Sequence, residues 1–201
     1  MRPAQIGPLA ATVLASLGIA SLLVPYAPAA TDRRETLNPL PRVVARLTST
    51  QEVPPIISGA RGSFRATLDE GASTISYELQ YEGFDSPVVQ AHLHTAQPGV
   101  NGGIMVWLCG SASLPGPPGT PACPEAPGTV AGQLTAEQVV GPSAQGISPG
   151  EFDEVLRAIR KGVTYANVHT ARYPAGEIRG QLRRGWNEPP RADEAEGAAR
   201  D

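Results

Sequence analysis

Hydrophobic and polar residues alternate with a period of two along most of the chain after residue 41. Eight segments share this alternation, are rich in β-branched residues and are bounded by Gly, Pro, Asp or Asn. They are residues 42–50, 62–69, 73–83, 88–95, 103–110, 128–135, 163–170 and 176–182. Such a pattern is typical of short strands that turn one face toward a core. The sequence therefore predicts an all-β domain, a Greek-key-like sandwich or barrel of about eight short strands.

Two segments before the seventh of these strands have a helical pattern instead. Thr135 stands three residues before Gln138, which matches a capping box. Ser148 is the predicted N-cap of a second helix, with Pro149 at its first helical position. The apolar residues that follow recur at helical spacing up to Gly162, which ends the helix. We therefore expect one or two short helices in the loop between the last strands.

The first 29 residues have the pattern of a signal peptide. Arg2 precedes an apolar run over residues 9–24, and Ala27-Pro28-Ala29 is a small-x-small cleavage motif. The run is shorter than the roughly 20 residues that span a bilayer. We therefore predict cleavage after residue 29, export to the periplasm or the medium, and no transmembrane anchor in the mature protein. A retained N-terminal anchor is the alternative.

Composition defines the remaining domain boundaries and excludes one class of partner. One domain is expected over residues 42–184, preceded by a linker at residues 30–41. The polar residues 185–201 lack aromatics after Trp186 and are expected to be disordered. The formal net charge is −3 and no basic stripe occurs, which argues against nucleic acid as a partner.

Cys109 and Cys123 are the two cysteines of the chain, separated by a segment rich in Pro and Gly. In an oxidising compartment they are expected to form one disulfide. Closing a loop of this size would stabilise the fold by about 3 kcal/mol on the chain-entropy account. A pair of metal-binding thiolates is the alternative, although the spacing matches no compact CxxC site.

The three histidines of the chain are the strongest candidates for a functional site. His92 and His94 point to the same face of one predicted strand, and His169 lies on another. If the two strands are neighbours, three imidazoles converge and suit a zinc or copper ion. Alternatively, the rings are packing residues whose nitrogens are satisfied by hydrogen bonds. The polar neighbours expected around a metal site are Asn167, Glu177 and Arg179, and in the packing alternative Thr170 is a further hydrogen-bond partner.

Three stretches resemble the CHRD (chordin-type) family in order and spacing. They are ARLTSTQEVPP at residues 45–55, the His-x-His strand and its successor at residues 88–108, and VTYANVHTARYPAGEIRGQL at residues 163–182. The resemblance covers roughly residues 42–184 and implies an extracellular β domain, similar to exported single-domain members in bacteria. The His-x-His strand also resembles that of copper/zinc superoxide dismutase. A fourth copper histidine and the separate zinc cluster are missing here, so only a mononuclear copper or zinc site can be built.

Two functions from different classes follow. The first is a non-enzymatic exported module that binds an extracellular or envelope ligand through loops at one end of the domain, since no nucleophile is paired with a base. The alternative is a mononuclear copper or zinc protein that uses the three histidines. No cofactor is assigned by the sequence beyond this alternative.

Overall fold

The computed structural model describes residues 40–185. The signal peptide predicted at residues 1–29, nearly all of the linker predicted at residues 30–41 and all but the first residue of the tail predicted at residues 185–201 lie outside this range. Within the described range, no helix combines the length and the apolar character that crossing a membrane requires.

The described chain forms nine strands, one α-helix and three short 3-10 helices. The strands are β1 (Arg42–Thr48), β2 (Arg61–Asp69), β3 (Thr74–Glu82), β4 (Val88–Thr95), β5 (Gly103–Gly110), β6 (Gly128–Leu134), β7 (Thr164–Thr170), β8 (Ile178–Gln181) and β9 (Arg183–Arg184). The helices are η1 (Ser49–Gln51), η2 (Ala136–Gln138), η3 (Ser143–Gln145) and α1 (Phe152–Arg160). All eight predicted strands are present, and the short β9 was not predicted.

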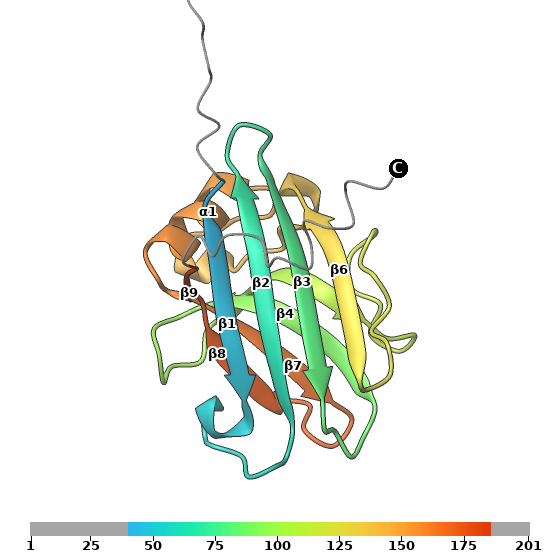
Figure 1. Cartoon of the computed structure of the whole chain (residues 1–201). Helices are drawn as coiled ribbons and strands as arrows, with labels where there is room; N and C mark the ends of the chain where they lie inside the picture. The colour runs from blue at the N-terminus through green and yellow to red at the C-terminus, as the bar shows by residue number, and fades with distance from the viewer. Residues whose placement is uncertain (1–39, 186–201) are drawn as a thin grey trace, which may run out of the picture. The chain divides into compact units, whose positions relative to one another are not determined.

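The strands form one antiparallel sheet in the order β5-β4-β7-β8-β1-β2-β3-β6, with β9 beside β1. The sheet folds back on itself, so that β1, β2, β3 and β6 lie in front of β4 and β7 in Figure 1. Its two ends approach each other, since Val106 of β5 forms a bridge with Val139 after β6. The result is a nearly closed barrel, which confirms the prediction of an all-β fold.

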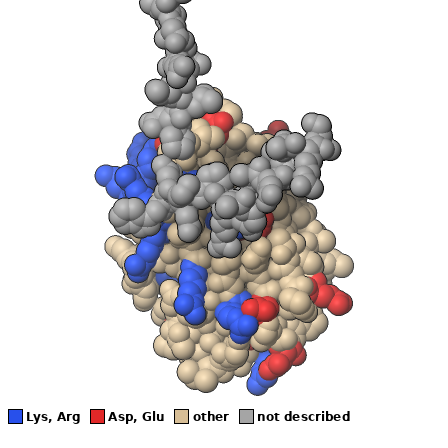
Figure 2. Space-filling model, in the orientation of Figure 1, with Lys and Arg blue, Asp and Glu red and all other residues tan. Residues whose placement is uncertain are grey.

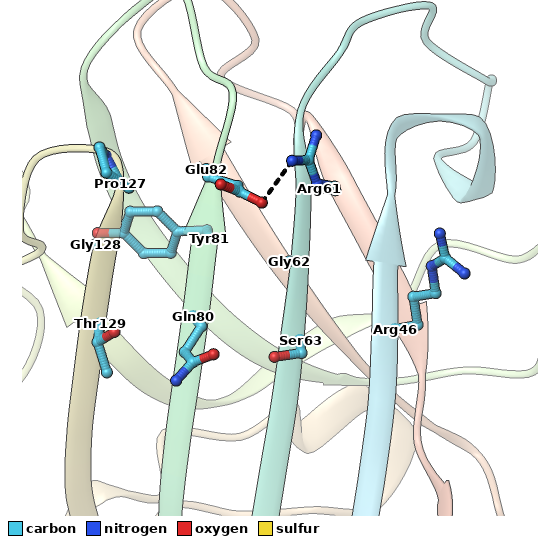
Figure 3. A pocket seen from close by; sticks show the side chains of 10 residues that line it. All are labelled: Arg46, Arg61, Gly62, Ser63, Gln80, Tyr81, Glu82, Pro127, Gly128 and Thr129. Carbon is cyan, nitrogen blue, oxygen red and sulfur yellow. Dashed lines mark ion pairs between the residues drawn. The ribbon is translucent and has the colours of Figure 1, made fainter.

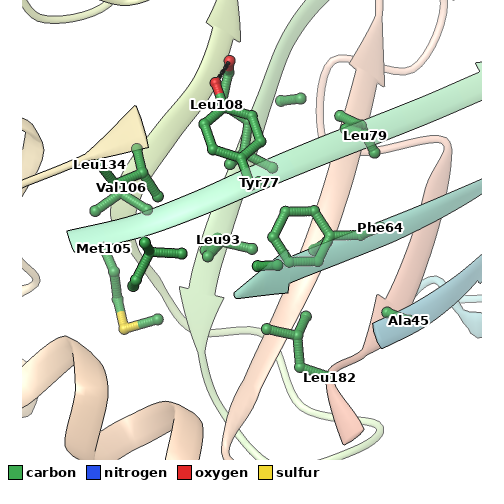
Figure 4. Close-up of a cluster of buried hydrophobic side chains, with 14 of the residues drawn as sticks. Ala45, Phe64, Tyr77, Leu79, Leu93, Met105, Val106, Leu108, Leu134 and Leu182 are labelled. Carbon is green, nitrogen blue, oxygen red and sulfur yellow. Dashed lines mark hydrogen bonds between the residues drawn. The ribbon is translucent and has the colours of Figure 1, made fainter. Parts of the chain in front are cut away.

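Apolar side chains from both halves of the sheet fill the interior of the barrel (Figure 4). Phe64 and Tyr77 of the front strands stack with ring centroids 6.2 Å apart. The Tyr77 hydroxyl donates a hydrogen bond of 2.6 Å to the carbonyl of Leu108 on β5, across the core. This pairing satisfies the polar end of an otherwise apolar buried side chain, and burial raises the pKa of Tyr77 to about 12.

The helix α1 packs its apolar face against the same core. It begins at Phe152 rather than at the predicted Pro149, because Gly150 has a φ of +86°, outside the right-handed helical region. The prediction of Ser148 as its N-cap is therefore wrong. The backbone N–H of Ser148 instead donates to the carboxylate of Glu151 at 2.6 Å. A capping-box contact is thus present, but it closes a turn that precedes the helix.

Two other helix signals have the predicted outcome. Gly162, with a φ of +72°, follows the last turn of α1 and ends it. Thr135 and Gln138 form the expected capping box, although the helix that follows, η2, is a single 3-10 turn.

The two halves of the sheet differ on their outer faces. In the exposed layer (β1, β2, β3 and β6), buried and exposed residues alternate, as a face open to solvent requires. In the covered layer (β4, β5, β7 and β8), most residues are buried, and all seven residues of β7 are. Connecting segments must therefore cover the outer face of this layer.

The outer face of the exposed layer carries a shallow polar groove (Figure 3). Neighbouring strands contribute Arg46, Ser63, Gln80 and Thr129 to it. At one end of the groove Arg61 and Glu82 form an ion pair of 2.7 Å (Figure 3). Acidic and basic side chains meet on this face of the molecule in Figure 2.

Candidate metal centre

The three histidines lie on the outer face of the covered layer. His92 and His94 are on β4 and His169 is on the antiparallel neighbour β7. Their chain neighbours Leu93 and Val168 point the other way, into the core. The histidine side chains are nevertheless buried, with exposed fractions of 0%, 7% and 5% in chain order. The pairing of β4 with β7 thus brings together the residues that sequence spacing had placed on separate strands.

One nitrogen atom from each ring lies within 4.8 Å of the others. The closest pair is Nδ1 of His92 and Nε2 of His169, 3.2 Å apart. Two nitrogens bound to one ion at 2.0–2.1 Å with a tetrahedral angle lie about 3.3 Å apart. This separation matches that of two ligands on one ion, and the pair becomes available to an ion once His92 carries its proton on Nε2 instead of Nδ1. A pair at the 4.8 Å limit has to close by about 1.5 Å, which side-chain rotations supply.

Backbone carbonyls fix the orientation of two of the rings. Nδ1 of His94 is 3.0 Å from the carbonyl oxygen of Gly102, and Nδ1 of His169 is 3.0 Å from that of Pro174. A carbonyl oxygen only accepts, so each Nδ1 carries the proton and each Nε2 has a free lone pair. Hydrogen bonds of this kind orient and polarise histidine ligands in metal sites.

Two of the six ring nitrogens, Nε2 of His92 and Nε2 of His94, are left without a hydrogen-bond donor within the described part of the chain. Because Nε2 of His169 has a lone pair, Nδ1 of His92 donates to it, and Nε2 of His92 is then deprotonated. Among the described residues, neither Nε2 of His92 nor Nε2 of His94 has a hydrogen-bond partner, and both atoms are buried. A buried polar atom left unpaired costs about 1–3 kcal/mol and calls for an explanation such as a bound ion.

All three imidazoles are neutral at physiological pH. Burial, followed by the charges of the two neighbouring rings, lowers the pKa of His92 to about 2. Burial lowers the pKa of His94 and of His169 to about 4, against the opposing effect of their carbonyl partners. The neutral ring is the form that binds a metal ion.

Aromatic side chains enclose the cluster. Tyr165 on β7 stacks on His94, with centroids 4.8 Å apart and planes 5° from parallel. Trp107 on β5 meets His92 edge to face at 4.3 Å and is half-buried. The place of both aromatics beside the histidines depends on the pairing of β4 with both β5 and β7.

Arg179 on β8 is 2% exposed and lies over the ring of Tyr165, with its Cζ 3.5 Å from the centroid. It donates hydrogen bonds to the carbonyls of Val100 (2.7 Å) and Gln97 (3.3 Å) and to the side chain of Asn101 (3.1 Å). A buried cation thus fixes the connection between β4 and β5 against the covered layer.

The other polar residues expected around the rings form hydrogen bonds elsewhere. Asn167 donates to the Glu52 carboxylate and to the carbonyl of Ile178. Thr170 donates to Glu177 at 2.7 Å. Burial raises the pKa of Glu52, partly offset by Asn167 and by the charge of Arg179. Within the described residues, the histidines form hydrogen bonds to backbone carbonyls and to one another, and none to these four side chains.

Cys109 and Cys123 form a disulfide, which confirms that prediction and rules out the pair as metal-binding thiolates. The loop that this disulfide closes packs on Trp107, the aromatic neighbour of His92. A Cβ atom on Gly116 would come within 2.8 Å of the Trp107 ring, so this backbone packs directly on the indole.

A comparison with protein families now identifies the domain. The family model described as CHRD domain matches residues 43–182. This chain belongs to the CHRD domain family. No curated protein and no solved structure matches it. The likeness of the CHRD domain's His-x-His strand to copper/zinc superoxide dismutase stays a resemblance of one motif.

Proposed function

We propose that this CHRD domain binds a single transition-metal ion through His92, His94 and His169. One observation carries the proposal. Two buried Nε2 atoms have no partner among the described residues, and they belong to a cluster of three neutral imidazoles. Both copper and zinc accept imidazole nitrogen.

The surroundings of the cluster support this function over simple packing. Packing histidines normally pair both ring nitrogens with protein groups or water. Here the carbonyls of Gly102 and Pro174 fix the Nδ1 protons of His94 and His169, so Nε2 of each of these rings carries a lone pair. Nε2 of His169 accepts from Nδ1 of His92, whereas Nε2 of His94 has no partner among the described residues. Neutral groups with aligned lone pairs, held inside a folded domain, are prepared to bind a cation at little cost in reorganisation.

The experiment is metal analysis of the purified full chain after metal removal and reconstitution, with copper and zinc tested separately. We expect one ion per chain. His94→Gln and His169→Gln are each expected to weaken binding by at least about 100-fold. Trp107→Phe serves as the matched control, because it changes a neighbour of the cluster and keeps all three ligands. Metal-free wild type after reconstitution, or binding by the histidine variants equal to that of wild type, contradicts the proposal.

We further propose that the protein is exported and non-enzymatic. Support comes from the signal-peptide pattern, the disulfide and the absence of a nucleophile–base pair in the sequence reading. A ligand in the envelope or medium stays a prediction. Intact mass of the protein from its native compartment tests the export step, and a mass that includes residues 1–29 is the contrary result.

A further inference from the structure

The charge and the number of donor groups at the histidine cluster distinguish one candidate ion from the other. We infer that the cluster is built for copper in the Cu(I) state, an inference that rests on the proposed metal function. The ligand set, the outer partners and the placement of Arg179 each support it independently.

The ligand set is small and neutral. Among the described residues, the metal-binding group consists of His92, His94 and His169, without a carboxylate or a thiolate. Zinc is almost always four-coordinate in proteins, and a three-histidine zinc site adds water as the fourth ligand. None of the three side chains is more than 7% exposed, so water has little access. Cu(I) has a filled d shell and is satisfied by two or three ligands, which the cluster supplies by itself.

The outer partners are neutral as well. In many zinc sites the outer N–H of a histidine donates to a carboxylate, which offsets part of the charge of the ion. In this cluster those N–H groups donate to the carbonyls of Gly102 and Pro174. The buried carboxylates nearby accept hydrogen bonds from other groups: Glu52 from Asn167, and Glu177 from Thr170. The electrostatic cost of burying an ion rises with the square of its charge, so a divalent ion costs about four times as much as a monovalent one.

Arg179 adds a fixed positive charge beside the cluster. Its guanidinium and the ring of His94 both lie against Tyr165, at 3.5 and 4.8 Å from the ring centroid. The buried carboxylate of Glu52 offsets part of this charge. The remainder opposes the second positive charge of Cu(II) or Zn²⁺ more than the single charge of Cu(I).

The same guanidinium is a positioning group. Its hydrogen bonds to Gln97 and Val100 fix the connection that ends at Gly102. The N–H of Gly102 donates to the Tyr165 hydroxyl at 3.2 Å, and its carbonyl holds His94. Arg179 therefore acts on the ion through its charge and through the orientation of one ligand.

Two competition titrations of the full chain test the identity of the ion. Cu(I) is titrated without oxygen against a chromophoric Cu(I) chelator, and Zn²⁺ against a chromophoric zinc chelator. We expect one Cu(I) per chain, bound at least about 100-fold more tightly than Zn²⁺, because burying a divalent ion among neutral groups costs several kcal/mol more. Zinc binding that equals or exceeds Cu(I) binding overturns the inference and leaves the metal function intact. Failure of both ions to bind overturns the metal function itself.

Redox titration of the copper-loaded protein tests the role of Arg179. Arg179→Gln removes the charge, and the ratio of Cu(I) affinity to Cu(II) affinity is expected to fall about tenfold. Arg179→Lys keeps the charge and is expected to restore most of that ratio. Arg65→Gln, on the outer face of the exposed layer, is the control and should leave the ratio unchanged. An unchanged ratio in a folded Arg179→Gln variant, checked by near-ultraviolet circular dichroism, overturns the electrostatic role. If that variant fails to fold, the Cu(I) and zinc titrations of the wild type still decide the inference.

Discussion

The two layers of the barrel differ in how their outward polar side chains find hydrogen-bond partners. On the exposed layer, outward side chains such as Arg65 reach water and form surface ion pairs, here with Glu78 at 2.9 Å. On the covered layer, outward side chains of similar polarity lie under connecting segments, and Arg179 is 2% exposed. Polar groups cost free energy when they lose water, so each of them needs a protein partner. A buried polar group of the covered layer that lacks a partner therefore calls for an explanation.

Most of the buried polar side chains of the covered layer meet this requirement within the protein. Arg179 and Asn167 both donate to well-placed oxygens. Nε2 of His92 and Nε2 of His94 do not meet this requirement within the described residues. Folding alone accounts for the first group, because its members hold connecting segments in place. It does not account for two buried imidazole nitrogens of one cluster that lack a partner in the described part of the chain, which is why the metal function is proposed at this point and not in the groove of the exposed layer.

The largest expected effect that separates the layers is acid destabilisation of the metal-free protein. The three histidines all belong to the covered layer, and burial holds their pKa values at about 2 for His92 and about 4 for His94 and His169. In the unfolded chain a histidine binds a proton below about pH 6.5. Between pH 6.5 and 4 the unfolded state therefore binds more protons, and the free energy of unfolding falls as the pH falls. Each histidine contributes up to about 1.4 kcal/mol per pH unit.

Urea unfolding at several pH values between 7 and 4, with chelator present, measures this dependence. The stability should be fully present above pH 6.5 and should be largely lost near pH 4. His94→Gln removes one titrating group and should make the dependence shallower by about one proton. A free energy of unfolding that stays level from pH 6.5 to 4.5 would mean that the rings are not buried as a neutral cluster.

The contrast between layers also explains what the sequence could predict. A period of two identifies strands and shows which residues share a face, so all eight predicted strands are present and His92 and His94 were placed together. The period does not reveal whether loops cover that face. Nor does it show that β4 pairs with β7, because that contact joins residues far apart in the chain. The sequence could not predict that Arg179 is buried against the β4–β5 connection, because this contact also joins residues far apart in the chain.

Local errors have local causes. The helix starts later than predicted because Gly150 adopts a positive φ, which no hydrophobic pattern signals. Strand β9 consists of Arg183 and Arg184 alone, and two adjacent arginines show no alternation. It follows β8 in the chain and pairs with the opposite end of β1, at Val43 and Val44.

A matched pair of arginine substitutions gives the next largest effect. Arg179→Met removes a buried cation with three hydrogen-bond partners, and we expect a loss of about 3 kcal/mol in the free energy of unfolding. Arg65→Met removes a side chain that is 66% exposed and pairs with Glu78 across β2 and β3, and we expect a loss below about 1 kcal/mol. Urea unfolding of both variants at neutral pH measures the difference. Equal losses would show that the connection between β4 and β5 does not depend on the guanidinium.

The smallest expected effect on the free energy of unfolding comes from a substitution on the outer face of the exposed layer. Gln80 points into the shallow groove of that layer, flanked across the sheet by Ser63 and Thr129 (Figure 3). Its amide hydrogen bond goes to Glu78 on its own strand, so Gln80→Ala should change the free energy of unfolding by no more than about 0.5 kcal/mol. The metal content and the pH dependence should equal those of wild type. If this substitution altered the metal content, the ion would depend on both layers, and the assignment of function to the covered layer alone would fail.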